Sequence, residues 1–291
     1  MFQEWLLEEK EVVTKFNAEV LLLDYGDMLL DLKKPMHLFE KIVAATVANV
    51  AGLNRKSMNR ITKALSGFRK AHPPRSRPPI PDELAAAISA VQMSMGYRTS
   101  ALLTWVGQRC YFRPGERLKI QVQDLLPPAG GAGLGRQQWS IQIAPEDRLE
   151  PSKTQTFDDT IIVDDSPRLG AILGRLAEGK APASLLFDMA PNRVRQEWSE
   201  ACQLLGFPEL VMYQLRPVGA SSDLLGRKRA MGEVMSRMRV RTLVTLRRYA
   251  KPGRITMMLQ RMSPAGRTYA NAALSRIDDV LEGKHVMPFV P

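Results

Sequence analysis

Four polar side chains along this chain are of types that could act on a phosphodiester. Arg113 begins an Arg-Pro-Gly-Glu sequence, Lys153 lies in a segment typical of a β-turn, and Arg216 and Tyr249 follow in helical surroundings. A guanidinium presents a planar fork of donors that matches two non-bridging phosphate oxygens, and a positioned hydroxyl can attack phosphorus. Taken singly, these residues also have ordinary explanations: a local ion pair, a solvated lysine, or a core tyrosine with its hydroxyl in water.

Taken together, the order and spacing of these residues resemble the catalytic domain of tyrosine recombinases, the phage-integrase family. That family has an arginine, a β-turn lysine, a His-x-x-Arg motif, a histidine or tryptophan, and finally the tyrosine nucleophile. Arg113 with the following Glu116 matches the first arginine and its glutamate, and Arg216 matches the second arginine. Lys153 matches the lysine and Tyr249 the nucleophile, and the residues after Arg216 are similar too, as Gly219-Ala220-Ser221.

The resemblance implies a DNA-cleaving and rejoining activity that needs neither ATP nor a metal nor another cofactor. In this interpretation the Tyr249 hydroxyl attacks the phosphorus and forms a 3′-phosphotyrosyl intermediate. Arg113 and Arg216 clamp the non-bridging oxygens, where charge develops in the transition state. Lys153 protonates the departing 5′ oxygen, as the family lysine does.

Two positions depart from the family pattern. Tyr213 stands where His-x-x-Arg has its histidine, and Val240 stands at the histidine-or-tryptophan position nine residues before Tyr249. Tyr213 can still donate to a phosphate oxygen, but a phenol with a pKa of about 10 is a poor base near neutral pH. Valine donates no hydrogen bond at all. These departures leave two alternatives open: a slow recombinase, or a recombinase-derived DNA-binding protein without chemistry.

Charge is distributed unevenly and favours a nucleic-acid partner. The chain has 291 residues, 41 Lys+Arg and 30 Asp+Glu, so its formal charge is +11. Residues 216–267 hold thirteen basic and two acidic residues, and the other 239 residues balance at 28 of each sign. Residues 41–81 hold nine basic residues and no acidic one. Two basic surfaces suit a protein that grips duplex DNA from two sides, although basic side chains are often merely solvated.

These two tracts provide the expected DNA contacts. In the first tract they are Lys56, Arg60, Lys63, Lys70, Arg75 and Arg77. In the second tract they are Arg239, Arg241, Arg247 and Arg248. The spacing of Met58, Ile61, Leu65 and Phe68 predicts that one side of a helix packs while Lys56, Arg60, Lys63 and Lys70 share another side.

The pattern along the chain predicts a mainly α fold with a small antiparallel β-sheet (α+β). Residues 1–75 are predicted to be a helical core-binding domain, residues 76–81 a Pro-rich linker, and residues 82–291 the recombinase-like catalytic domain. Trp139–Ile143 and Thr160–Val163 are expected to pair, with Lys153 near their turn. A terminal helix is expected over about Thr268–Leu281.

The expected partner is double-stranded DNA. The segment 268–291 is expected either to dock on a neighbouring subunit bound to DNA, as the resemblance implies, or to pack on its own domain. An RNA-binding helical protein is a weaker alternative, because aromatic residues make up only 7% and no stacking motif is found. No apolar run has membrane-spanning length, the start lacks a signal peptide's basic region, and Cys110 and Cys202 suggest reduced, packed thiols. The predicted location is intracellular: the nucleus in a eukaryote, otherwise the cytoplasm or nucleoid.

Overall fold

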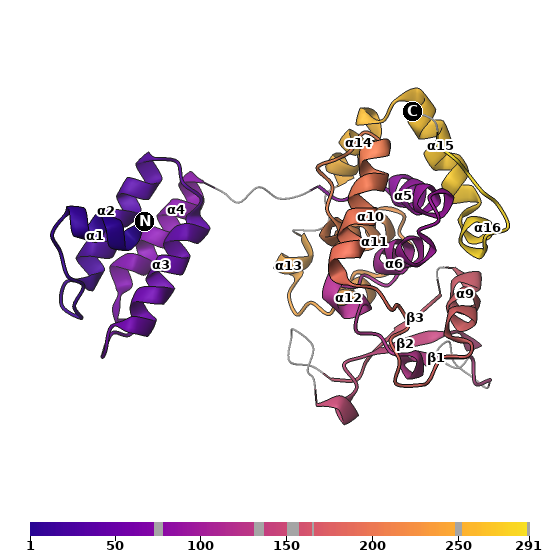
Figure 1. Cartoon of the computed structure of the whole chain (residues 1–291), viewed down its shortest axis with the longest axis horizontal. Helices are drawn as coiled ribbons and strands as arrows, with labels where there is room; N and C mark the ends of the chain where they lie inside the picture. Colours follow the sequence, from indigo (N-terminus) through magenta and orange to yellow (C-terminus); the bar gives the residue numbers. More distant parts are fainter. Residues whose placement is uncertain (73–77, 131–136, 150–156, 165, 248–251, 290–291) are drawn as a thin grey trace. The chain divides into compact units, whose positions relative to one another are not determined.

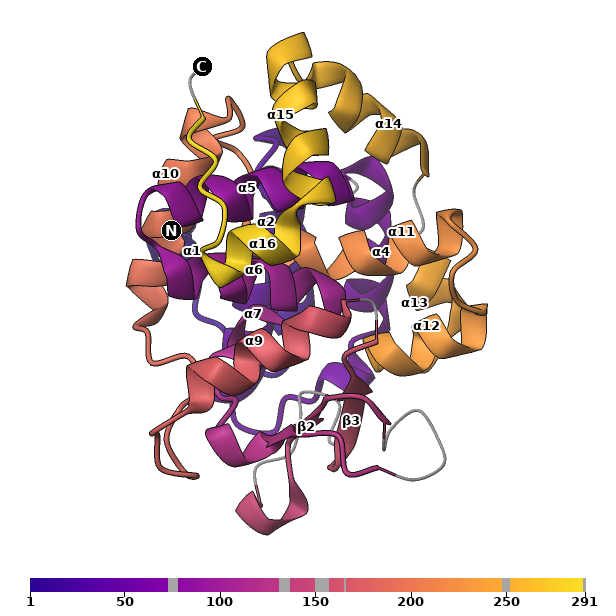
Figure 2. The ribbon, with the colours of Figure 1, turned by 90° about the vertical axis from the view of Figure 1, so that its right-hand side faces the viewer.

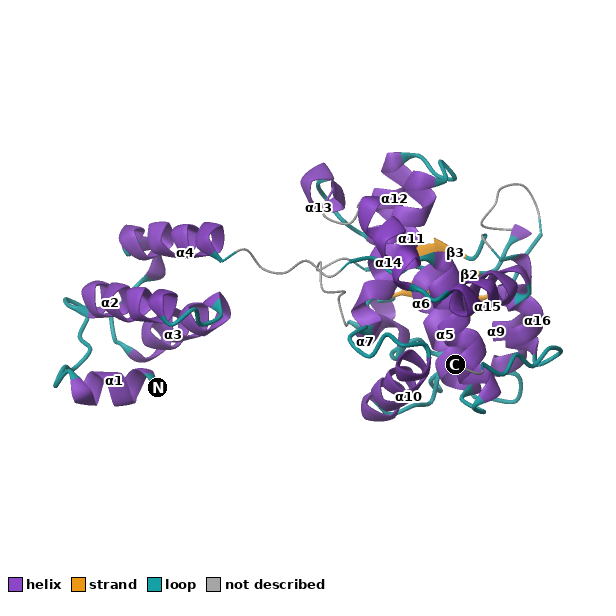
Figure 3. Ribbon diagram, turned by 90° about the horizontal axis from the view of Figure 1, so that it is seen from above, coloured by secondary structure: helices purple, strands orange, loops and turns teal. Residues whose placement is uncertain are grey.

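The computed structural model describes residues 1–72, 78–130, 137–149, 157–164, 166–247 and 252–289. The chain divides into two compact units, Met1–Ser76 and Arg77–Pro291. Figure 1 labels the elements of both units, and the colouring of Figure 3 shows that helices predominate in each. Within the described ranges, none of the helices combines the length and the apolar character needed to cross a membrane.

The first unit is a small group of helices around one apolar core. Its elements are α1 (Phe2–Glu8), α2 (Ala18–Asp31), α3 (Met36–Asn49), the 3₁₀ helix η1 (Arg55–Ser57) and α4 (Asn59–Ala71). The core contains aromatic and branched side chains from α2, α3 and α4, among them Leu22, Tyr25, Phe39, Val43 and Leu65. Burial of such a stripe is what stabilises helices of this length, which are marginal in water by themselves.

Helix α4 has the two distinct sides that the sequence predicts. Its apolar stripe is buried: Met58 just before it, then Ile61, Leu65 and Phe68. The basic side chains of η1 and α4 are exposed, namely Lys56, Arg60, Lys63 and Lys70. The predicted buried side of this helix is therefore confirmed, and the predicted basic side chains are exposed, but Lys56 lies in η1 rather than in the same helix.

Helix α5 (Asp82–Ser94) forms the centre of the second unit. Its side chains are buried from Leu84 to Gln92, and four of them are alanines, which let neighbouring helices approach closely. The helices that pack against it include α6 (Arg98–Arg109), α10 (Pro191–Leu204), α15 (Pro264–Ser275) and α16 (Ile277–Glu282), as Figure 2 shows. Pro81 is the N-cap of this helix, and Asp82 takes its first helical position.

Shorter elements connect and cover this bundle. The remaining α-helices are α7 (Pro114–Arg117), α9 (Pro167–Ala177), α11 (Leu215–Leu225), α12 (Met231–Met238), α13 (Leu243–Arg247) and α14 (Pro252–Arg261). The remaining 3₁₀ helices are η2 (Val122–Asp124), η3 (Glu146–Arg148) and η4 (Met212–Gln214). Cys110 and Cys202 are buried free thiols, as the sequence suggests.

The sheet has three short antiparallel strands in the order β1-β2-β3. They are β1 (Leu125–Leu126), β2 (Ser140–Ile143) and β3 (Asp159–Ile162). Ser140 pairs with Ile162 and Ile143 with Asp159, so the predicted pairing of these two segments is confirmed, while β1 is an addition. The predicted fold class, mainly α with a small antiparallel sheet, is confirmed.

The end of the chain differs from the single helix expected over 268–281. The helix is broken at Arg276 into α15 and α16. Both bury apolar side chains in the core of their own unit, including Ala270, Ala273, Val280 and Leu281. Their apolar side is therefore occupied by packing on their own domain, which is the second of the two expectations for this segment.

Candidate functional site

Glu116 is the carboxylate around which the candidate site is built. It is the third residue of α7, whose N-cap is Arg113 and whose first residue is Pro114. The backbone N–H of Arg113 donates to Glu116 Oε2 at 2.8 Å, and the Arg113 guanidinium donates to Oε1. The local Arg–Glu ion pair foreseen for Arg113 is thus present, and it fixes the carboxylate at the start of the helix.

Arg216 reaches the same carboxylate from the first turn of α11. Its Nη1 lies 3.9 Å from Glu116 Oε2, although Arg216 follows Glu116 by 100 residues. Only 2% of its side chain is exposed. Its guanidinium also donates to two backbone carbonyls, that of Tyr111 at 3.3 Å and that of Met238. The fold therefore brings together the two arginines that the sequence singled out.

Arg239 is a third guanidinium at this carboxylate. Its Nη2 donates to Glu116 Oε2 at 2.5 Å, and its Nη1 donates to the carbonyl of Arg237 at 3.1 Å. The residue ends α12 in the left-handed conformation, with φ 53° and ψ 49°, and its side chain is 4% exposed. Arg239, predicted to contact DNA from a basic surface, is instead buried beside Arg113 and Arg216.

Opposite charges at this cluster change the pKa of its members. Burial alone would raise the pKa of Glu116, but Arg239 and Arg113 outweigh it, so this pKa lies below its ordinary value. Burial lowers the pKa of Arg239, although Glu116 opposes the shift. Asp159, the first residue of β3, acts on Arg239 in the same direction as Glu116. The start of β3 therefore belongs to the electrostatic surroundings of the cluster.

Tyr213 and Val240, the two departures from the family pattern, each lie close in sequence to one arginine of this cluster. Tyr213 is in η4, with 43% of its surface exposed, three residues before Arg216. Val240 follows Arg239 and packs, half-buried, against the apolar group of Val234 and Leu246. Val240 is thus part of local packing, and the adjacent Arg239 is the side chain that enters the cluster.

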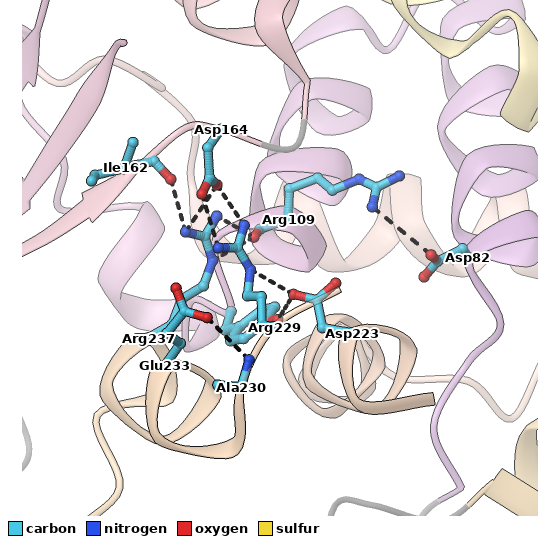
Figure 4. Close-up of polar contacts among 10 residues, drawn as sticks. Asp82, Arg109, Ile162, Asp164, Asp223, Arg229, Ala230, Glu233 and Arg237 are labelled. Atoms are coloured by element: carbon cyan, nitrogen blue, oxygen red, sulfur yellow. Dashed lines mark hydrogen bonds and ion pairs between the residues drawn. The ribbon is translucent and has the colours of Figure 1, made fainter. Parts of the chain in front are cut away.

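A second network attaches α12 to β3 and α11 (Figure 4). Arg229 donates to both carboxylate oxygens of Asp164, at 2.8 and 2.6 Å, and to Asp223 at 2.8 Å. Arg237 lies 3.3 Å from Asp164 and donates to the carbonyl of Arg109 at 2.9 Å. Both arginines belong to the basic tract, yet they make internal contacts. These contacts fix the helix that ends at Arg239.

The other predicted site residues fall into two groups. Lys56, Arg60, Lys63 and Lys70 are exposed in the first unit, and Arg241 and Arg247 are exposed in the second. The remaining ones lie outside the described residues: Lys153, Tyr249, Arg75, Arg77 and Arg248. Within the described ranges, no cluster of three histidine, cysteine or acidic side chains is arranged to hold a metal ion.

Sequence reasoning missed Asp159, Asp164 and the internal position of Arg239. No motif marks the two aspartates, because their role depends on arginines far away in the chain. Arg239 carried one weak signal, since it is adjacent to Val240, where the resemblance requires a hydrogen-bond donor.

Comparison with known proteins finds similarity in structure but not in sequence. No family model matches the chain, and no curated protein matches it in sequence. Among solved structures, the chain is similar to a XerA recombinase with 14% sequence identity and a TM-score of 0.42, covering 89% of this chain and 95% of that one. We base the functional proposal on the residues of this chain rather than on that likeness.

Proposed function

We propose that this protein binds duplex DNA and cleaves and rejoins its strands through Tyr249. The observation that carries the proposal is the convergence of Arg113 and Arg216 on one buried carboxylate, although the two lie on different helices. Two guanidinium groups held together provide the paired donors that a phosphodiester needs as charge develops on its non-bridging oxygens. Glu116 holds them in place while no DNA is bound.

The proposed reaction exchanges one phosphodiester for another. The Tyr249 hydroxyl oxygen bonds to phosphorus and loses its proton, and the bond between phosphorus and the 5′ oxygen breaks. Lys153 gives a proton to that departing oxygen, which leaves as a free 5′ hydroxyl. The 3′ end stays attached to Tyr249. Attack by a 5′ hydroxyl reverses each step, so rejoining needs no outside energy source.

Two basic surfaces would hold the DNA. The exposed Lys56, Arg60, Lys63 and Lys70 form one surface in the first unit. Arg241 and Arg247 belong to the other, in the second unit. Lysine and arginine contacts to phosphates release counterions, so such binding weakens steeply as salt rises.

A second candidate is a recombinase-derived protein that binds DNA without cleaving it. One observation favours it: Arg216 is almost fully buried, and its guanidinium donates to the carbonyls of Tyr111 and Met238. Those donors would have to be redirected before they could contact a phosphate. Val240 also lacks the donor that the resemblance requires at its position.

The two candidates are distinguished by a covalent adduct. The probe is a pool of nicked duplex oligonucleotides of randomised sequence. After cleavage, the short fragment between the cut and the nick, which carries the new 5′ hydroxyl, diffuses away, so rejoining is prevented and the intermediate is trapped. Strand cleavage predicts a labelled protein–DNA band with the full-length protein and none with Tyr249→Phe. An adduct that persists in Tyr249→Phe would contradict the assignment of the nucleophile. Salt-sensitive binding without any adduct would favour the second candidate.

A further inference from the structure

We propose that Arg239 is a third catalytic arginine, which contacts the scissile phosphate and supplies the hydrogen-bond donor that Val240 cannot. This inference rests on the proposed strand cleavage. It assigns a chemical role to a residue whose sequence context marks it only as one of thirteen basic residues in a tract.

The position of Arg239 is the first argument. Its guanidinium shares the carboxylate of Glu116 with Arg113 and Arg216, so any anion held by those two arginines lies within reach of the third. The side chain of Arg239 is 4% exposed, so it belongs to this cluster rather than to the exposed basic side chains of the tract. A long cationic side chain is rarely buried to this extent unless it is paired, and its partner here is the carboxylate that it shares with Arg113 and Arg216.

The unused hydrogen-bonding capacity of Arg239 is the second argument. Its Nε is buried and has no hydrogen-bond partner among the described residues. Buried polar groups are almost always paired, and an exception calls for a ligand, an ion or a catalytic role. A phosphate oxygen is an acceptor that suits a guanidinium particularly well. Arg239 therefore has one buried donor that the described residues leave unused, as do Arg109, Arg117 and Arg148, and among these four only Arg239 shares a carboxylate with Arg113 and Arg216.

The backbone at Arg239 is the third argument. A non-glycine residue with φ 53° is uncommon, and such a conformation persists where the surrounding structure determines it. Arg237, two residues earlier, is held by Asp164 and by the carbonyl of Arg109. The left-handed backbone conformation of Arg239 then directs its own side chain to Glu116. A preorganised donor of this kind lowers a barrier because it does not have to reorganise during the reaction.

The competing explanation is that Arg239 merely neutralises Glu116. The two roles differ when the charge-balanced double variant, Arg239→Met with Glu116→Gln, is compared with Glu116→Gln alone, because Arg113 and Arg216 lose the same counterion in both. A structural role predicts that removing Arg239 does not lower the cleavage rate further in that background, since no carboxylate is left for Arg239 to neutralise. Contact with the phosphate predicts that the double variant cleaves more slowly than Glu116→Gln.

The experiment measures the rate of adduct formation on the randomised nicked duplex pool at saturating DNA. Arg239→Met is expected to lower this rate roughly 10²–10³-fold, the usual effect of removing one preorganised donor. Arg195→Met replaces an exposed arginine of α10 and is expected to keep the rate of the original protein. Guanidinium ion, added far below unfolding concentrations, is expected to restore part of the rate in Arg239→Met only.

Each outcome bears on a separate statement. If Arg239→Met, folded by its melting curve, forms adduct at the rate of the original protein, the role of Arg239 is overturned and strand cleavage stands. If Arg239→Met does not fold, Arg239→Lys with the charge-balanced double variant decides between the two roles of Arg239 in the same way. If the original protein forms no adduct, strand cleavage itself fails, and the catalytic role of Arg239 fails with it.

Discussion

At the scale of single residues, Glu116 is the carboxylate that three guanidinium groups share. Its side chain is 12% exposed and is approached by the guanidinium groups of Arg113, Arg216 and Arg239. Burying arginines costs desolvation energy, which an ionised carboxylate in good geometry partly offsets. The charge of this one residue therefore holds together three segments that are far apart in sequence.

Loss of that charge is expected to destabilise the protein. Glu116→Gln leaves three guanidinium groups without their common counterion, and breaking a buried pair in this way costs roughly 3–5 kcal/mol. Thermal unfolding at pH 7 measures the effect. Asp188→Asn, which neutralises an exposed carboxylate of the same unit, is the control and should leave the melting temperature nearly unchanged. An equal effect of both variants would show that the cluster contributes nothing beyond net charge.

The effect of Glu116→Gln on stability should depend on pH. Because the pKa of Glu116 is lower in the folded protein than in the unfolded chain, its charge stabilises the fold above the unfolded pKa. That stabilisation is lost as the pH falls through the folded pKa. The gap in melting temperature between the original protein and Glu116→Gln should therefore be widest near neutral pH and shrink in acid. A gap that stays constant would contradict the charge-based explanation.

At the scale of elements, α9 is positioned by one tryptophan. Gly170 and Gly174, one turn apart on α9, both face the indole of Trp139, which directly precedes β2. A Cβ at position 174 would come 2.6 Å from Trp139 Cη2, and one at position 170 would overlap the indole. The two glycines form a groove that lets the helix lie directly on the residue that begins the strand.

Filling this groove is expected to move the helix. Gly170→Ala should destabilise the protein by roughly 1–3 kcal/mol, as overpacking usually does. The control is Gly232→Ala in α12, where an added Cβ meets nothing within 4 Å and helix propensity should give a slight gain in stability. Chemical denaturation measures both changes. A neutral Gly170→Ala would mean that Trp139 leaves the groove at little cost.

What the sequence predicts depends on how local the determinant is. The stripe of Met58, Ile61, Leu65 and Phe68 was predictable because helical periodicity lies within one segment. Strand β1 was not, because two residues carry no detectable alternation. Arg113 and Arg216 could be chosen as site residues from their order in the chain. The burial of Arg239 could not be predicted, because it depends on a contact with Glu116, 123 residues away.

At the scale of the whole molecule, the net charge differs from the charge that exposed side chains offer to a partner. Residues 216–267 carry an excess equal to the full formal charge of +11. At least five of the thirteen basic residues there, Arg216, Arg229, Arg237, Arg239 and Arg261, make internal contacts. Part of the excess positive charge therefore makes contacts within the fold rather than forming a basic surface. DNA affinity should then depend more on where exposed basic residues lie than on the total charge.

The first unit allows a charge-matched test of this dependence. Replacing Lys56, Arg60, Lys63 and Lys70 by glutamine removes four charges from the exposed side of η1 and α4. The slope of log affinity against log salt should become shallower by about 0.9 for each phosphate that is no longer neutralised, and so by up to about 3.6 in all. Fluorescence anisotropy with a labelled duplex over a range of salt concentrations measures it.

The matched control replaces the four basic residues of the acidic first 40 positions, Lys10, Lys15, Lys33 and Lys34, by glutamine. These lysines are exposed too, and the net charge falls by the same amount. Because long-range attraction is screened beyond about 10 Å at 0.1 M salt, charges away from the phosphates add little to binding. The control should therefore keep the original slope. An equal decrease of the slope in the two variants would mean that DNA binding depends on net charge alone. That result would contradict the proposal that α4 is a binding surface.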